Sequence, residues 1–217
     1  MKLIQREDYL NKLINVIGTP DIKVITGIRR SGKSKLLEAF KKYIENSIKD
    51  CNIIHINFSL AKFENLKEYH KLYEYIDNNY KEKMNNFVLI DEVQMCEGFE
   101  NTINSIHAEE RFDIYITGSN AFLLSSDLAT LFTGRTFSIE VFPFSFKEFI
   151  GYYQYDDLEK AFDAYVMYGG MSGSYLYKEE NEKYEYIKDV YDTLIAHDIK
   201  KKYKIKNSEV FEGVNNF

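Results

Sequence analysis

Apolar residues in the first part of the chain follow two alternating patterns. Short, mostly apolar runs occur at residues 23–26, 52–58, 86–91 and 113–118. Such runs are typical of buried parallel strands, which are covered on both faces. Between these runs, apolar residues recur at helical spacing over residues 6–17, 34–48, 60–80 and 99–110. Because strands alternate with helices, the pattern predicts an α/β fold with a parallel sheet.

The pattern changes in the second part of the chain. A fifth strand is predicted at residues 136–142, where apolar and polar residues alternate. From residue 145 to 206 the spacing is helical, apart from a Gly-Gly break at 169–170. We therefore predict a core at residues 1–143, a helical lid at 144–206, and at 207–217 a tail or the start of a further region.

Composition and charge exclude several classes of protein. The 217 residues are 45% hydrophobic and 29% charged, with a formal net charge of −6. An acidic chain is a poor general binder of nucleic-acid backbones, so any such contact has to be local. Cys51 and Cys96 fall in different predicted elements and indicate no disulfide framework. No signal peptide and no apolar run of 18 residues is found, which predicts a cytoplasmic protein without a membrane span.

The clearest motif is Gly-Ile-Arg-Arg-Ser-Gly-Lys-Ser at residues 27–34, a full match to the phosphate-loop pattern. Glycines let the backbone turn so that its N–H groups face phosphate oxygens. Lys33 is predicted to reach the β- and γ-phosphates of ATP or ADP, and the Ser34 hydroxyl to bind Mg²⁺. An ordinary glycine turn is the alternative, but the preceding strand and following helix favour the phosphate loop. The predicted nucleotide-binding residues are Gly27, Ile28, Arg29, Arg30, Ser31, Gly32, Lys33, Ser34 and Lys35.

Two further strands end in polar residues. Asp91 ends the third run and Glu92 follows it. Asp91 is predicted to hold Mg²⁺ and Glu92 to polarise the attacking water. Alternatively, they only end a strand and cap the next segment. The fourth run is predicted to lie between the loop strand and the acidic strand, with Ser119 or Asn120 as a sensor of the γ-phosphate or the water. Alternatively, or in addition, one of them is a helix N-cap.

Only five arginines occur in the chain. Arg135, just before the fifth strand, is a candidate for stabilising transition-state charge, in trans if the protein assembles. A surface ion pair is the alternative. Arg29 and Arg30 lie within the loop and face phosphate, a partner or solvent. Arg6 precedes the first strand and is a weaker candidate for the surroundings of the nucleotide base.

Six segments that occur in order along nearly the whole chain carry a family resemblance. They are GIRRSGKS, LIDEVQ, ITGSN, TGRTFSIEVFPFSFKEF, YGGM and AHDIKKKY. They resemble the prokaryotic AAA+ ATPases related to the STAND NTPases. The resemblance implies a P-loop NTPase fold: a five-stranded parallel sheet flanked by helices, with a C-terminal helical lid. It also implies Lys33 and Ser34 at phosphate and magnesium, Asp91 and Glu92 at magnesium and water, Ser119 and Asn120 as sensors, and Arg135 as a finger.

The chain departs from this family in two respects. Members usually continue into a winged-helix-like segment and a larger C-terminal domain, so we expect this chain to stop before that region. No arginine follows Arg135, so the lid supplies no arginine sensor, which favours a switch over a ring-type motor.

Three functions remain open from the sequence. The first is an ATP-hydrolysing switch, and the second is a nucleotide-binding module without useful turnover that serves as a protein or nucleic-acid platform. The third, a small-molecule kinase, is disfavoured by the adjacent carboxylates and the sensor strand. Expected partners are ATP, a second copy of the chain, and a protein or DNA reached through the missing C-terminal region.

Overall fold

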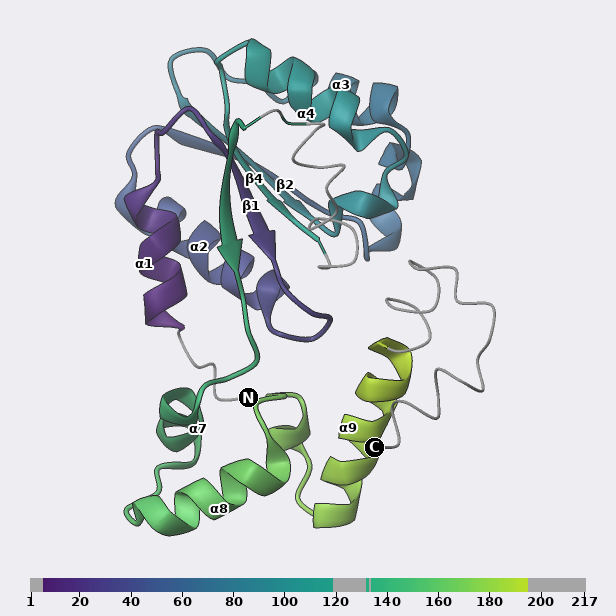
Figure 1. Cartoon of the computed structure of the whole chain (residues 1–217). Coiled ribbons are helices and arrows are strands. Elements are labelled where there is room, and N and C mark those ends of the chain that lie inside the picture. The colour runs from purple at the N-terminus through teal and green to yellow at the C-terminus, as the bar shows by residue number, and fades with distance from the viewer. Residues whose placement is uncertain (1–5, 119–131, 133, 195–217) are drawn as a thin grey trace.

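The computed structural model describes residues 6–118, 132 and 134–194 (Figure 1). The sheet is built from five strands: β1 Ile22–Thr26, β2 Cys51–Asn57, β3 Asn85–Asp91, β4 Asp113–Thr117 and β5 Thr136–Glu140. The α-helices are α1 Glu7–Asn15, α2 Lys33–Ser47, α3 Tyr69–Asn78, α4 Phe99–Ala108, α7 Phe146–Tyr153, α8 Leu158–Tyr168 and α9 Glu180–Thr193. Short 3₁₀ helices lie at η1 Ala61–Leu66, η2 Val93–Met95 and η3 Ser174–Leu176.

All five strands are parallel and follow the order β2-β3-β4-β1-β5. The predicted fold class, a five-stranded parallel sheet flanked by helices, is thus confirmed. The predicted position of the fourth strand is also confirmed, because β4 lies between β1 and β3. Parallel strands end at the same edge of a sheet, so the segments after β1, β3 and β4 meet there, where open α/β sheets bind ligands.

Helices cover both faces of the sheet (Figure 1). On β3, Val88 and Ile90 pack among buried residues of α3 and α4, while Phe87 and Leu89 pack among those of α1 and α2. This alternation follows from the two-residue period of a strand. The central strands β1, β3 and β4 are buried on both faces, whereas the edge strands β2 and β5 are buried on one face at most.

One predicted helix is interrupted. Residues 60–80 form η1 and α3, separated by a short extended stretch, because Glu68 forms a parallel bridge with Glu97. The N–H of Glu97 donates to the carbonyl of Lys67, and the N–H of Tyr69 donates to the carbonyl of Glu97. These backbone bonds to a distant segment replace helical bonds, which the periodicity of the apolar residues does not reveal.

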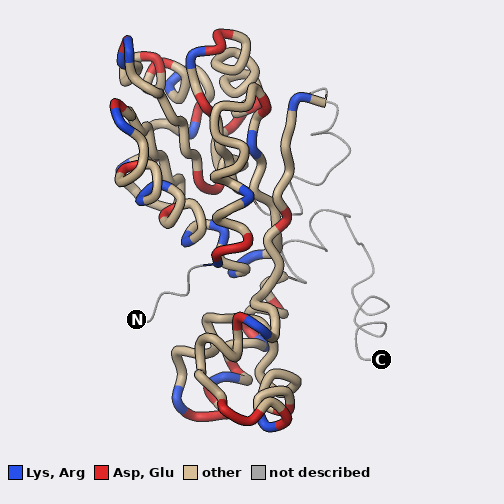
Figure 2. The backbone as a smooth tube through the Cα atoms, turned by 90° about the vertical axis from the view of Figure 1, so that its left-hand side faces the viewer, with Lys and Arg blue, Asp and Glu red and all other residues tan. Residues whose placement is uncertain are grey.

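The chain after β5 forms a helical segment, residues 146–194, that lies apart from the sheet in both views (Figures 1 and 2). It has a small core of its own around the fully buried Phe149. The prediction of helix throughout was wrong at residues 154–157, because Gln154 adopts a left-handed conformation and Asp157 caps α8. The predicted break at 169–170 is also longer, since α8 ends at Tyr168 and α9 starts at Glu180, with η3 between them. Residues 195–206 lie outside the described part of the chain.

Candidate nucleotide-binding site

The phosphate loop connects β1 to α2 at the carboxyl edge of the sheet. Its first residue, Gly27, has φ of 143°. A Cβ atom at this position would stand 2.2 Å from the carbonyl oxygen of Val141. Only glycine therefore fits, since it accepts the backbone angle and leaves room for the chain that follows β5.

The interior of the loop holds several polar groups. The ammonium of Lys33 is buried and donates to the carbonyls of Gly27 and Ile28, both at 2.9 Å. Among the described residues, the hydroxyls of Ser31 and Thr26 are buried without a hydrogen-bond partner. Buried hydroxyls without a partner cost free energy, so they suggest that a polar ligand belongs here. The loop thus offers a cation and hydroxyl groups beside the N-terminus of α2, where anions are favoured.

The predicted acidic pair lies at the neighbouring strand ends. Asp91, which is 2% exposed, accepts a hydrogen bond of 2.5 Å from the hydroxyl of Thr117 at the end of β4. The same hydroxyl accepts the backbone N–H of Glu92 at 3.1 Å. Glu92 has a φ of 56°, an unfavourable angle for a residue with a side chain, and the bond to Thr117 stabilises it. One hydroxyl therefore fixes both acidic residues relative to β4.

The side chain of Glu92 has a partner of its own. Gln94, in η2, donates from its amide nitrogen to the Glu92 carboxylate. The amide oxygen of Gln94 is buried and has no partner within the described residues. The carboxylate that we expect to polarise water is therefore held by a neighbour two positions along the chain.

The remaining loop residues are more exposed. Ile28 and Ser34 are half-buried, while Arg29 and Arg30 are exposed. Arg30 has a φ of 63° and stacks on the ring of Tyr186 in α9, with 5.0 Å between the guanidinium carbon and the ring centroid. Lys35 is exposed and pairs with Glu38 along α2 at 2.8 Å. The loop is thus in contact with the helical segment through Arg30.

Arg135 lies at the opposite edge of the sheet. Its backbone carbonyl accepts the N–H of Ile22 at the start of β1, and its side chain is exposed. The register pairs Thr136 with Ile22 and Glu140 with Thr26, so the length of β1 separates Arg135 from the loop. Five residues of strand span about 16 Å, more than an arginine side chain reaches. Ser119 and Asn120 lie outside the described residues.

Reasoning from the sequence did not find every residue of this site. Thr117 lies two positions before Ser119, the first of the two predicted sensors, and no motif marks its role. Gln94 follows the acidic pair without any recognisable motif. Glu148 pairs with Arg6, which also donates to the carbonyl of Ser31 in the loop. In the sequence Glu148 belongs to a Ser-x-x-Glu pattern, the usual signal of a capping box, which indicates a helix start and not a contact with the loop.

The sheet order and the loop together define a class. The chain is a P-loop nucleotide-binding protein in which an extra strand, β4, separates the loop strand from the acidic strand. A family model described as "AAA domain" matches residues 19–150, more than half of the chain. The chain therefore belongs to the AAA domain family. Its fold and its place in this family identify it as an AAA-type nucleotide-binding domain.

One curated protein and two solved structures are similar to this chain over most of its length. An uncharacterised protein of Haemophilus influenzae is 35% identical over 98% of this chain and 54% of its own length. The chain thus spans about half the length of that relative. The Walker-type ATPase PABY2304 of Pyrococcus abyssi has a TM-score of 0.54 and 19% identity, covering 93% of this chain and 76% of that one. The Saccharomyces cerevisiae Hsp104–ADP complex has a TM-score of 0.57 and 16% identity over 70% of this chain and 24% of that one. These structural similarities concern the fold alone.

Within the described residues, no helix has both the length and the apolar composition needed to cross a membrane. Both cysteines are free thiols. Lys and Arg are interspersed with Asp and Glu along the part of the chain that forms the sheet and its helices (Figure 2).

Proposed function

We propose that this chain binds ATP or ADP with Mg²⁺ on residues 27–35 and hydrolyses ATP as a nucleotide-dependent switch of the STAND-related kind. The main support for this proposal is that the phosphate loop lies at the same edge of the sheet as Asp91 and Glu92, which are joined through Thr117. We further propose that residues 1–143 act as the ATPase core and residues 144–206 as a helical lid.

Each residue has a role that its chemistry supports. In this proposal the ammonium of Lys33 leaves the loop carbonyls and binds the β- and γ-phosphates. Ser34 and the buried Asp91 hold Mg²⁺, whose charge offsets that of the phosphates. Glu92 accepts a proton from the attacking water once its carboxylate is released by Gln94. Ser119 and Asn120 stay sensor candidates.

Arg135 acts in trans in this proposal. The separation along β1 keeps it from the loop of its own chain, so it supplies transition-state charge only to a second copy. Self-association is therefore part of the proposal, as is a protein or DNA partner. The proposed location is the cytoplasm.

A second candidate is a nucleotide-binding module without useful turnover. It is favoured by the hydrogen bond between Gln94 and Glu92, which keeps the expected general base engaged. In that case the chain binds ADP tightly and serves as a platform for another protein or for nucleic acid.

The test is phosphate release from ATP and Mg²⁺ by the purified chain, with Lys33→Ala and Glu92→Gln beside it. Matched controls are Lys42→Ala, on the exposed side of α2, and Glu97→Gln, an exposed carboxylate near the acidic pair. Turnover that only the two site variants abolish supports the switch. Binding of ADP without turnover, lost only in Lys33→Ala, supports the module. If Lys33→Ala changes neither binding nor turnover, both proposals fail.

A further inference from the structure

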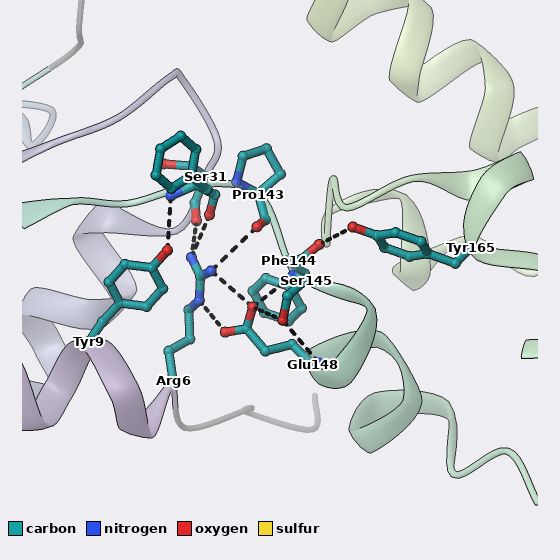
Figure 3. Close-up of polar contacts among 9 residues, drawn as sticks. Arg6, Tyr9, Ser31, Pro143, Phe144, Ser145, Glu148 and Tyr165 are labelled. Carbon is teal, nitrogen blue, oxygen red and sulfur yellow. Dashed lines mark hydrogen bonds and ion pairs between the residues drawn. The ribbon is translucent and has the colours of Figure 1, made fainter. Parts of the chain in front are cut away.

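Arg6, the residue before α1, lies between the phosphate loop and the helical segment (Figure 3). Its side chain is 5% exposed. The guanidinium is sandwiched by two rings, 4.4 Å from the centroid of Tyr9 and 4.9 Å from that of Phe144. A charge this deeply buried is tolerated only if its donors are satisfied.

All five N–H groups of Arg6 are used. Nε and Nη2 donate to the two carboxylate oxygens of Glu148, at 2.6 and 3.0 Å, in a bidentate pair. Nη1 donates to the carbonyls of Ser31 at 2.9 Å and Phe142 at 2.8 Å. The remaining N–H of Nη2 donates to the carbonyl of Pro143 at 3.4 Å. Lysine, with three donors and no planar fork, cannot reproduce this set.

Glu148 is itself held in position. It completes the capping box of α7, accepting the backbone N–H of Ser145 at 2.8 Å and its hydroxyl at 3.0 Å. Burial favours the protonated form of Glu148, but the bonds from Arg6 and Ser145 outweigh it and hold the pKa below its ordinary value. Arg6 is therefore anchored to the start of α7 by an ionised carboxylate whose own position is set by the helix cap.

The carbonyl of Ser31 is the one loop group that Arg6 holds. Ser31 stands between two left-handed residues, Arg30 at φ 63° and Gly32 at φ 100°. In a trans peptide the C=O and the next N–H point in opposite directions, so fixing the carbonyl of Ser31 also fixes the N–H of Gly32. Such backbone angles persist only when surrounding contacts determine them. The bond from Arg6 is one of these contacts and stabilises this conformation of the loop.

We propose that Arg6 is a positioning residue for nucleotide binding: it ties the phosphate loop to the start of α7 through Ser31 and Glu148. The inference rests on the proposed function and assigns Arg6 to loop geometry. Arg6 itself does not contact the phosphates. It sets the direction of the Gly32 N–H, which binds phosphate in this proposal. Nucleotide affinity therefore depends on the contact between the loop and the start of α7.

The chain contains a second buried ion pair that serves as a control. Lys23, fully buried in β1, pairs with Asp113 at 2.7 Å. This pair involves the first residue of β4, at the edge opposite the phosphate loop. Breaking this pair destabilises β1, the strand that leads into the phosphate loop, without removing any contact of the loop itself. A merely structural role for Arg6 predicts that Arg6→Gln and Lys23→Met behave alike.

The experiment compares Arg6→Gln, Arg6→Lys, Glu148→Gln, Lys23→Met and the double variant Arg6→Gln/Glu148→Gln. The dissociation constant for ADP and Mg²⁺ is measured by calorimetry, and stability by urea unfolding. We expect Arg6→Gln to bind ADP about tenfold or more weakly, since small misplacements of binding groups carry such losses. Arg6→Lys recovers part of the affinity, the double variant is no weaker than Arg6→Gln, and Lys23→Met binds normally. If Arg6→Gln binds as wild type does, or loses no more than Lys23→Met, the inference is wrong.

Amide hydrogen exchange of residues 27–32 without nucleotide separates this inference from the proposed function. We expect faster exchange of these amides in Arg6→Gln and unchanged exchange in Lys23→Met. If the wild-type chain binds no ADP but the exchange result holds, the proposed function fails and the loop contact stands. If exchange is unchanged in Arg6→Gln, the inference fails whatever the chain binds. Should Arg6→Gln not fold, Glu148→Gln is expected to show the same effects more weakly.

Discussion

The hydroxyl of Thr117 gives a direct test of how the acidic edge of the sheet is built. Replacing Thr117 by valine keeps the shape of the side chain and removes only the hydroxyl. The change deletes the bond to the Asp91 carboxylate and leaves the N–H of Glu92 without its acceptor. A hydrogen bond to a charged group contributes about 1.5–3 kcal/mol, and a buried donor left unsatisfied costs about 1–3 kcal/mol. Because Glu92 is only half-buried, we expect Thr117→Val to lower the free energy of unfolding by about 2–4 kcal/mol.

The assay is urea unfolding followed by far-ultraviolet circular dichroism, with the slope m compared between variants. Thr117→Ser is the matched control, since it keeps the hydroxyl and loses one buried methyl group. We expect this control to lose about 0.5–1.5 kcal/mol, as small truncations of buried side chains do. A valine variant no less stable than the serine variant, with the same m, would refute the linking role of the hydroxyl. In the proposed ATPase, turnover by Thr117→Val should fall while Thr117→Ser retains most of it.

Three further predictions follow from single positions. Gly27→Ala should abolish ADP binding and lower the free energy of unfolding by at least about 2 kcal/mol, because the added Cβ meets the carbonyl of Val141. Calorimetry measures the binding and urea unfolding measures the stability. Unchanged values would contradict the close approach of Val141. Since the folded pKa of Glu148 lies below its ordinary 4.5, its contribution to stability is complete above that pH and is lost as the pH falls. Urea unfolding between about pH 6 and pH 3 should therefore show a smaller decline in Glu148→Gln, and an equal decline would refute the assignment. Burial raises the pKa of the Cys96 thiol to about 12, so little of the reactive thiolate forms at about pH 8. Native protein should therefore be alkylated first at the half-buried Cys51, as measured by mass spectrometry. Rapid labelling of Cys96 would contradict this.

Much of the fold can be predicted from the sequence because its signals are local. The buried strands appear as short apolar runs, and the helices that pack on them appear as a period of 3.6 residues, because both patterns follow from which faces are buried. The phosphate loop is eight consecutive residues whose glycines, lysine and serine are each needed by backbone geometry or charge. The position of β4 between β1 and β3 was predicted from the class of ATPase that the loop and the acidic pair indicate.

The contacts that shape the site are not local, and no periodic pattern carries them. Thr117 meets Asp91 across 26 positions, and Arg6 meets Glu148 across 142. Both contacts arise because parallel strands bring distant segments to one edge of the sheet. For Arg6 the sequence suggested only a weak role near the nucleotide base.

What the sequence by itself determined is the class of the protein: an α/β chain with a phosphate loop and an acidic strand end. Only the tertiary structure decided which side chains hold that loop and that strand end in position. The bonds of Arg6 to a carboxylate and three carbonyls require the close approach of α1, the loop and α7. The physical reason is that a buried cation must satisfy every donor, and the partners that satisfy it are chosen by the packing of whole elements.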